Sequence, residues 1–371
     1  MGALNTAIIG GGVAGLALAR ALVRREGSEA ALSRRLKIFE RHGSSRALGF
    51  GFLVQASGCA ALRQLGLAPG QAAFGQTLRQ VRIYSNEGRL LKEHRLEDTV
   101  AMERPTLLQA LGCDLPPGVL RYGLSMDGME MDRGRVHALR LSNGMTHPVD
   151  VVIGADGSHS RCRQVIESGP RLPGRLARVQ EIVACVDNPA VAAELGEGFI
   201  KLLHPCGGLA VGLVPLPRGR LIWFVQFDSQ RHRLAAGAPL VPFLHALLAD
   251  YPKWLREILA ATEPGLPHHW RPLDLDPPSR LAGPNLALIG DAAHPMLPFT
   301  SQGVNLALAD AALLADLLPE HDDPAAISAA LRSYEGQRQP LRPPFVAMGR
   351  AMAADFLASS QRTAARPPVA T

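Results

Sequence analysis

The N-terminal segment places a glycine-rich turn between a short apolar strand and a strong helix-forming run. Residues 6–9 read Thr-Ala-Ile-Ile, Gly10-Gly-Gly-Val-Ala-Gly15 follows, and residues 16–22 favour a helix. In a Gly-x-Gly-x-x-Gly turn the first glycine permits a tight turn, the second lets the backbone approach a pyrophosphate, and the third lets helix and strand pack closely. The helix N-terminus adds about half a positive charge. The turn predicts a Rossmann-like α/β domain that binds a dinucleotide.

A second apolar strand, residues 36–39, ends in Glu40 and is followed by Arg41. A carboxylate at this position of the fingerprint is expected to bind the ribose hydroxyls of an adenosine. Glu40 lies 25 residues after Gly15, whereas the usual gap is about 20. We expect the extra length in a polar loop at residues 26–35.

Residues 285–310 carry a second ligand-binding element. The apolar run Leu286–Ile289 predicts a buried strand that ends at Gly290-Asp291, and after a loop rich in proline Gln302-Gly303-Val304-Asn305 opens an apolar helix. A carboxylate at the strand end and a helix N-terminus pointing to the same place can hold a hydroxylated, electron-accepting ligand. This element favours a flavin over a nicotinamide as the bound dinucleotide.

A third strand with a carboxylate at its end is predicted at residues 151–156. Val-Val-Ile-Gly154-Ala leads to Asp156, which is followed by Gly157. The two glycines let a backbone approach a ligand closely, although Gly-Ala-Asp-Gly alone is also an ordinary turn.

The three segments in this order resemble the class A flavoprotein aromatic hydroxylases, the para-hydroxybenzoate hydroxylase family. The resemblance implies an α/β fold, in which a mostly antiparallel α+β substrate domain is inserted into the FAD-binding domain. It implies bound FAD, transient NAD(P)H, and hydroxylation of an aromatic or electron-rich substrate with O2 through a flavin hydroperoxide. The chemistry then belongs to the cofactor, and the protein positions it and excludes water.

The resemblance also implies roles for single residues. Arg104 is expected near the ribityl–pyrophosphate region, Asp156 near the pyrophosphate and the nicotinamide approach, and Asp291 on the ribityl chain. Residues 302–305 are expected against the isoalloxazine. The full set of expected FAD contacts is Gly10, Gly12, Val13, Ala14, Gly15, Glu40, Arg41, Arg104, Asp156, Gly157, Gly290, Asp291, Pro298, Gln302, Gly303, Val304 and Asn305.

The chain departs from the family just before Gln302, where Thr300-Ser301 stands in place of the Gly-Gly of many relatives. This difference leaves open whether the flavin moves. The run from Pro298 to Gly303 also resembles, more loosely, bacterial flavoproteins that help to make tryptophan-derived quinone cofactors in partner amino-acid oxidases. That resemblance implies an alternative substrate, a tryptophan in a partner protein.

Composition excludes several other classes. The 371 residues are 47% hydrophobic and 19% charged, and the net charge is +6 with a pI near 9.4. The basic residues are spread along the chain and mixed with acids, so we expect no nucleic-acid surface. The five cysteines form no Cys-x-x-Cys pair, which predicts free thiols and no metal site. With no basic leader and no apolar run of about 18 residues, we expect a cytoplasmic protein without a membrane span.

Element patterns suggest that two insertions form the substrate domain. Residues 78–97 are typical of a hairpin with a turn at 86–88, and 208–228 of an antiparallel pair. The expected boundaries are 1–77, 100–177 and 276–371 for the FAD-binding domain, and 78–99 and 178–275 for the substrate domain.

Catalytic side chains are hard to assign from sequence. Candidates in the substrate region are Tyr84, His204 and, as a stacking surface, Trp223, and for each the alternative is a core or surface residue. His294 is expected to pack and hydrogen-bond. A flavin-dependent halogenase is disfavoured because no Gly-x-Trp-x-x-Ile motif occurs. A flavin reductase or dehydrogenase, and a flavin-binding accessory protein without turnover, remain alternatives.

Overall fold

A computed structural model describes residues 4–25, 35–44, 51–71, 74–168, 174–235, 237–263 and 265–358. The loop expected at residues 26–35 lies outside these ranges, apart from its last residue.

A five-stranded parallel sheet forms the centre of the first domain. Its order is β18-β10-β1-β2-β6, and its strands are β1 Thr6–Ile9, β2 Leu36–Glu40, β6 Leu120–Tyr122, β10 Val151–Gly154 and β18 Leu286–Leu288. The chain leaves β1 toward β2 on one side, and β10 pairs with β1 on the other. The carboxyl ends of β1 and β10 therefore form a switch point, where sheets of this kind bind ligands.

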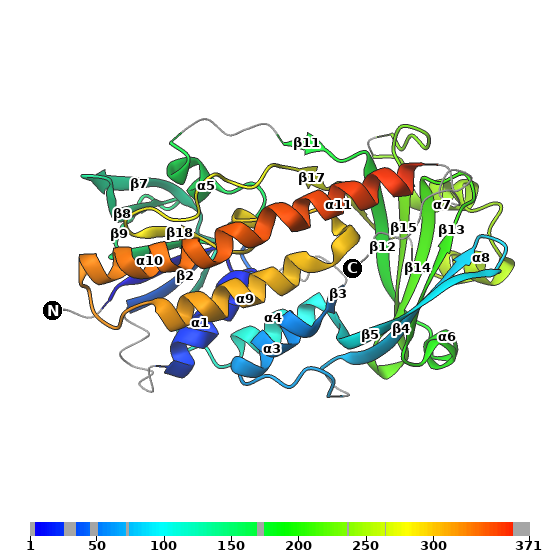
Figure 1. The fold of residues 1–371 in the computed structure, drawn as a ribbon, viewed down its shortest axis with the longest axis horizontal. Coiled ribbons are helices and arrows are strands. Elements are labelled where there is room, and N and C mark those ends of the chain that lie inside the picture. The colour runs from blue at the N-terminus through cyan, green and yellow to red at the C-terminus, as the bar shows by residue number, and fades with distance from the viewer. Residues whose placement is uncertain are drawn as a thin grey trace.

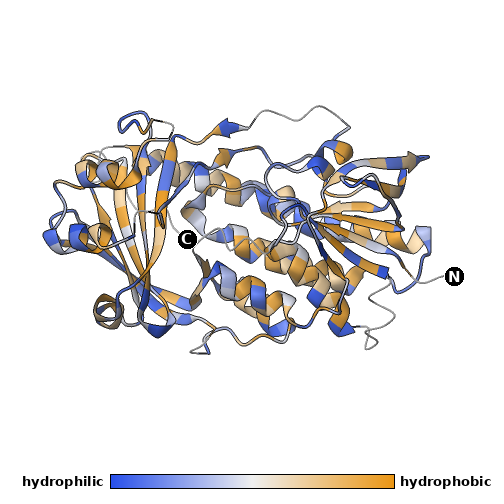
Figure 2. Cartoon of the chain, turned by 180° about the vertical axis from the view of Figure 1, so that it is seen from behind, coloured by the Kyte–Doolittle hydropathy of each residue, from blue (hydrophilic) through white to orange (hydrophobic). Residues whose placement is uncertain are grey.

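Alanine- and leucine-rich helices cover this sheet. α1 (Val13–Arg25) packs against α9 (Gln302–Leu317), and α3 (Ala56–Gln64), α4 (Arg104–Gly112) and α10 (Pro324–Arg338) pack around them. The buried faces are made of small and branched apolar side chains, which let the helices approach closely (Figure 2).

An eight-stranded, mostly antiparallel sheet forms the second domain, as predicted. Its order is β16-β12-β15-β14-β13-β4-β5-β3, with one parallel pair, β13 and β4. The expected hairpin around residues 86–88 is β4–β5, and the pair expected at 208–228 is β14–β15. The strands are β3 Gly51–Val54, β4 Gln76–Ser85, β5 Leu90–Glu103, β12 Val179–Asp187, β13 Gly198–Leu203, β14 Leu209–Pro215, β15 Arg220–Asp228 and β16 His268–Trp270.

The two faces of this large sheet have different partners. One face packs on α7 (Leu240–Leu247) and α8 (Lys253–Ala260), which together bury a core that includes Trp223. The other face looks toward the first domain and toward α11 (Arg342–Leu357), the long helix that runs between the two sheets in Figure 1. The end of α11 contacts the residue before β14, since Gly208 N–H donates a hydrogen bond to the Phe356 carbonyl at 2.6 Å.

Smaller elements complete the chain. A three-stranded sheet joins β7 (Met126–Asp132), β8 (Arg135–Leu141) and β9 (Thr146–Pro148). β3 lies within residues 1–77 but pairs in the large sheet, and the domain boundaries given above stay predictions. Searching the described residues finds no helix with the length and apolarity needed to cross a bilayer. Other described helices and strands are α5 Arg161–Ile166, α6 Pro189–Leu195, β11 Arg175–Leu176 and β17 Leu273–Asp274.

Candidate functional site

The carboxyl ends of four parallel strands bring the predicted segments together. Gly10 N–H donates to the Phe39 carbonyl at 2.9 Å, and Ala155 N–H donates to the Ile9 carbonyl at 2.8 Å. Ile289 N–H donates to the Gly154 carbonyl at 3.0 Å. The glycine turn thus lies between the ends of β2 and β10, with the end of β18 next in the row.

The three glycines of the turn occupy three different environments. Gly10 has φ +110°, and a Cβ there would lie 2.3 Å from the Ala155 carbonyl oxygen. A Cβ on Gly15 would lie 2.0 Å from the Gly10 oxygen. A Cβ on Gly12 would meet nothing within 4 Å. The fold itself therefore needs Gly10 and Gly15, whereas at Gly12 the space before the first turn of α1, Val13-Ala14, is open to a ligand.

Glu40 lies at the end of β2, beside this turn. Its Oε2 accepts a hydrogen bond from Gly11 N–H at 2.8 Å, and its Oε1 accepts from His42 N–H at 2.9 Å. Burial alone would raise the pKa of Glu40, but the hydrogen bonds from His42 and Gly11 outweigh it and lower that pKa. Glu40 is thus held as a carboxylate, and its neighbour Arg41 is exposed.

Asp156 follows β10 on the other side of the turn. Its Oδ2 accepts from the backbone N–H groups of Arg161 and Cys162, at 2.8 and 3.2 Å, and so caps α5. Its Oδ1 is buried without a hydrogen-bond partner among the described residues. Gly157 has φ +79°, and a Cβ there would meet nothing within 4 Å.

The end of β18 and the start of α9 meet as the sequence predicts. Gly290–Ala292 forms a 3-10 turn, η2, and Pro298–Thr300 a second one, η3. Ser301 has φ +53°, which turns the chain sharply into α9. A Cβ on Gly303 would lie 3.9 Å from Oδ1 of Asp291, whose side chain is exposed. The Asp291 carboxylate therefore lies beside the N-terminus of α9. The first turn of α9 contains no acidic residue, so the positive end of its helix dipole is not neutralised from within the helix.

The side chain of Asn305 is used within the protein. Its Oδ1 accepts from Gln55 N–H at 2.8 Å, and its Nδ2 donates to the carbonyls of Ser301 and Leu53 at 2.6 and 3.3 Å. Gln302 Nε2 donates to Gln55 Oε1. Asn305 thus holds the start of α9 against the segment that contains Leu53 and Gln55. Gln55 belongs to no motif, and no local sequence pattern marks it as a site residue.

Arg104 lies at the start of α4 and contributes the cation of the site. Its guanidinium carbon is 5.7 Å from the centre of the Phe52 ring. Burial lowers the pKa of Arg104, while the charges of Asp291 and Glu40 act to raise it. Its Nε is buried and finds no hydrogen-bond partner among the described residues. The charge of Arg104 therefore interacts with the carboxylates of both Glu40 and Asp291. Its Nε–H remains available to donate a hydrogen bond to a ligand oxygen.

A buried network of Asp310, His294 and Arg338 holds the start of η2 in place. Asp310 of α9 accepts from Gly290 N–H at 3.1 Å, lies 2.8 Å from Nε2 of His294, and pairs with Arg338 at 2.6 Å. Burial alone would raise the pKa of Asp310, but His294, Arg338 and Arg342 hold it far below its usual range. His294 is thus a fully buried hydrogen-bonding residue, as expected.

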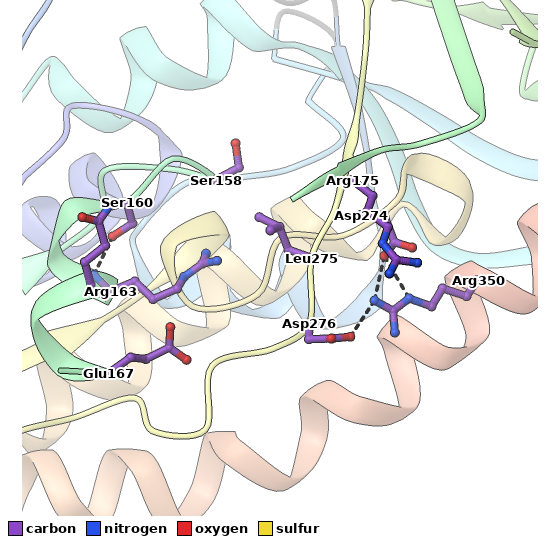
Figure 3. A pocket seen from close by; sticks show the side chains of 10 residues that line it. Ser158, Ser160, Arg163, Glu167, Arg175, Asp274, Leu275, Asp276 and Arg350 are labelled. Atoms are coloured by element: carbon purple, nitrogen blue, oxygen red, sulfur yellow. Dashed lines mark hydrogen bonds and ion pairs between the residues drawn. The ribbon is translucent and has the colours of Figure 1, made fainter. Parts of the chain in front are cut away.

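A cavity of about 370 Å³ lies beside the Asp156 loop. It is bounded by Ser158, by α5, by the β17 segment and by α11 (Figure 3). Arg163 in its wall donates to the carbonyls of Asp291 and Ala292, each at 2.8 Å. Arg350 pairs with Asp274 and Asp276 at 2.8 and 2.7 Å. The cavity is therefore separated from the Asp291 turn by one arginine.

The three candidate catalytic side chains lie elsewhere. Trp223 is fully buried and donates its Nε1–H to Thr262 Oγ1 at 2.9 Å, so its proposed role as a stacking surface is wrong. Tyr84 packs against the same core, and the His204 ring lies 6.4 Å from that of Tyr251. All three belong to the face that α7 and α8 cover. Strand alternation separates the two faces but does not tell which one looks toward the ligand.

The residues at the strand ends fit a bound FAD. The backbone at Gly12 leaves room for a ligand. The unpartnered Nε of Arg104 and the N-termini of α1 and α9 offer hydrogen-bond donors to its oxygens. A search of the described ranges finds no grouping of side chains suited to a metal ion, and the five cysteines are free.

Comparisons with known proteins agree with this geometry. The sequence profile of the FAD binding domain family matches residues 3–346. The 3-amino-4-hydroxybenzoate 2-monooxygenase of Streptomyces cremeus is 30% identical over 370 residues, which covers 95% of this chain and 88% of the relative. The kynurenine 3-monooxygenase of Salinispora arenicola is 27% identical and is covered over 76% of its length, with 90% of this chain.

Solved structures share the fold. The crystal structure of Klebsiella pneumoniae HpxO complexed with FAD and uric acid superposes with a TM-score of 0.81 at 24% identity, covering 97% of this chain and 90% of that one. A salicylate hydroxylase substrate complex gives a TM-score of 0.75 at 22% identity, covering 96% and 89%.

Proposed function

The chain belongs to the FAD binding domain family and is a FAD-dependent monooxygenase of the aromatic hydroxylase type, and we propose that it uses NAD(P)H and O2 to hydroxylate a small, electron-rich aromatic compound. The observation that carries the proposal is that buried Arg104 lies within the electrostatic reach of both Glu40 and Asp291, while Asp291 lies beside Gly303 at the α9 N-terminus. FAD, when bound, supplies the electron transfer and the oxygen chemistry.

The residues of this chain hold that cofactor at separate points. In this proposal Gly10–Gly15 and the α1 N-terminus bind the pyrophosphate, Glu40 the adenosine ribose, and Asp291 the ribityl chain. Arg104 donates its unpartnered Nε–H to an oxygen between them. The first turn of α9 stabilises negative charge on the ring, since a helix N-terminus carries about half a positive charge.

We propose that NAD(P)H binds transiently, because the sequence holds one dinucleotide fingerprint and FAD occupies it. The cavity beside Ser158 supports an approach near Asp156, since its volume of about 370 Å³ falls in the range of small-molecule sites. The free thiols fit a reducing, cytoplasmic setting as part of the same proposal.

The substrate class is inferred from relatives. Proteins similar to this chain are named for 3-amino-4-hydroxybenzoate, kynurenine and urate. Each of these is an aromatic small molecule with electron-donating groups, which favours a small molecule over a tryptophan held in a partner protein.

The test is turnover with FAD-loaded protein, NADPH or NADH and a panel that contains 3-amino-4-hydroxybenzoate and kynurenine. The proposal expects substrate-stimulated NAD(P)H oxidation and one atom from ¹⁸O2 in the product by mass spectrometry. NAD(P)H oxidation without labelled product from any compound would indicate a reductase. Label found only in a peptide tryptophan would favour the partner-protein alternative.

A further inference from the structure

The sheet face that looks toward the first domain carries a hydrogen-bonded chain of three polar side chains, two of them ionisable. Lys201 of β13 donates from Nζ to Oε1 of Gln226 on β15 at 2.8 Å, and Gln226 donates from Nε2 to Oε2 of Glu181 on β12 at 3.0 Å. Gln226 is buried, whereas Lys201 and Glu181 each keep part of their surface accessible. None of these three residues belongs to the sequence motifs described above.

Small residues on the intervening strand make this chain possible. Gly212 of β14 pairs with Lys201 on one side and with Phe224 on the other, and Ala210 pairs with Gln226. A Cβ on Gly212 would lie 2.1 Å from the Phe224 ring, so the ring lies over the glycine. The lysine can therefore reach diagonally across β14 to the glutamine.

Three phenyl rings surround the ammonium group. Nζ of Lys201 lies 6.0 Å from the ring centre of Phe224, 5.9 Å from that of Phe299 and 5.8 Å from that of Phe356. Phe299 belongs to η3, the turn that leads from Asp291 to Gln302. Lys201 thus lies where the large sheet meets η3, half-buried among aromatic side chains.

Within the described ranges, the Lys201 ammonium uses one of its hydrogen-bond donors. It carries three N–H groups, and Gln226 is the acceptor for one of them. Ring faces attract the charge but accept no ordinary hydrogen bond. An aromatic ligand with an anionic oxygen suits this site. The oxygen can accept hydrogen bonds from the remaining N–H groups of Lys201, and the aromatic ring can pack among the phenyl groups.

We propose that Lys201 binds the ionised acidic group of an aromatic ligand, such as a carboxylate or phenolate, and that Glu181 takes up a proton from solvent when that anion binds. Lys201 and Glu181 already neutralise each other through Gln226. An arriving anion places two negative charges beside one positive charge, and protonation of Glu181 removes the excess. The step makes and breaks no other covalent bond.

The electrostatic surroundings of Lys201 and Glu181 are consistent with proton uptake by Glu181. Burial lowers the pKa of Lys201 to about 8, and Glu181 opposes that change. Burial raises the pKa of Glu181 to about 7, opposed by the hydrogen bond from Gln226 and by Lys201. Among the described residues, the only charge that acts on each of the two is the other. The residues that pair with or pack on the two from β4, β14, β15, β16, η3 and α11 are uncharged: Ile83, Ala210, Gly212, Phe224, Gln226, Trp270, Phe299 and Phe356. Two ionisable residues lie on the same sheet face one position further along: His268 on β16 and Asp228 on β15, and Asp228 already pairs with Arg178 and Arg231.

The inference rests on the proposed aromatic hydroxylase function, but its test needs no turnover. FAD-loaded protein is titrated with benzoate and with benzamide, its uncharged analogue, and binding is followed by calorimetry. Hydrogen bonds to a charged group predict that benzoate binds about 10- to 100-fold more tightly. Lys201→Met should abolish this preference, whereas the exposed-lysine control Lys253→Met should keep it.

Infrared difference spectra of the native protein at about pH 8 give the second readout. Benzoate, and not benzamide, should produce the carbonyl band of a newly protonated carboxylic acid, and Glu181→Gln should lack that band. Equal affinity for the two probes, an unchanged preference in Lys201→Met, or no new band on benzoate binding would each overturn the inference. Protein that passes these tests but oxidises no NAD(P)H would refute the proposed function and leave this subsite standing.

Discussion

Gly12 allows the cofactor assignment to be separated from fold stability. A Cβ at this position meets no protein atom within 4 Å, and Gly12 does not have positive φ. Gly12→Val should therefore change the free energy of unfolding of the FAD-free protein by less than about 1 kcal/mol. In the complex the new side chain fills the space assigned to the pyrophosphate. Loss of about two hydrogen bonds to a charged group costs about 3–6 kcal/mol, which raises the Kd for FAD about 10²- to 10⁴-fold.

The assay is FAD titration by flavin fluorescence, together with thermal unfolding of the FAD-free protein. Gly336→Val is the matched control, because Gly336 is exposed on α10 and its Cβ also meets nothing within 4 Å; it should bind FAD normally. Gly15→Ala is the opposite case, since its Cβ would lie 2.0 Å from the Gly10 oxygen and should destabilise the fold itself. Wild-type FAD affinity in Gly12→Val would refute the placement of the pyrophosphate.

Three further substitutions test the remaining contacts. Asp291→Ala should yield folded but colourless protein, because this side chain is exposed; a yellow preparation would contradict its role. Glu40→Gln should weaken FAD binding by about 1–3 kcal/mol, the scale of a charge-assisted hydrogen bond, and an unchanged flavin titration would remove Glu40 from the site. Asp310→Asn should lower stability by about 3–5 kcal/mol, since it leaves His294 and Arg338 without their buried partner. The pKa of Asp310 is lowered in the folded protein, so its contribution is present above the unfolded pKa of about 4 and is lost as pH falls. The difference in melting temperature between wild type and Asp310→Asn should therefore narrow below about pH 4, and a constant difference would argue against the charge network.

The sequence predicted the segments whose chemistry is local. The turn from Gly10 to Gly15 and the step from β18 to Asp291 need only a strand, a turn and the next helix, and parallel pairing of β1, β10 and β18 then brings them together. Gln55 was missed because its contacts to Gln302 and Asn305 join segments about 250 residues apart in the chain, and no local pattern marks such a contact.

Residues of the large sheet were harder to predict for the same reason, because their contacts join distant parts of the chain. Lys201, Gln226 and Glu181 meet only because β12, β15, β14 and β13 are neighbours in a particular register. The one available signal was a single lysine within the apolar strand β13. Trp223 was misassigned because its strand has two apolar faces, and the face that α7 and α8 cover is decided by tertiary packing.

A crystal structure of the protein with bound FAD would show directly where the cofactor lies. We expect the pyrophosphate in front of Gly12 and the α1 N-terminus, the ribityl chain beside Asp291, and the ring against the first turn of α9. A flavin held elsewhere, or protein that takes up no FAD under any condition, would contradict this expectation.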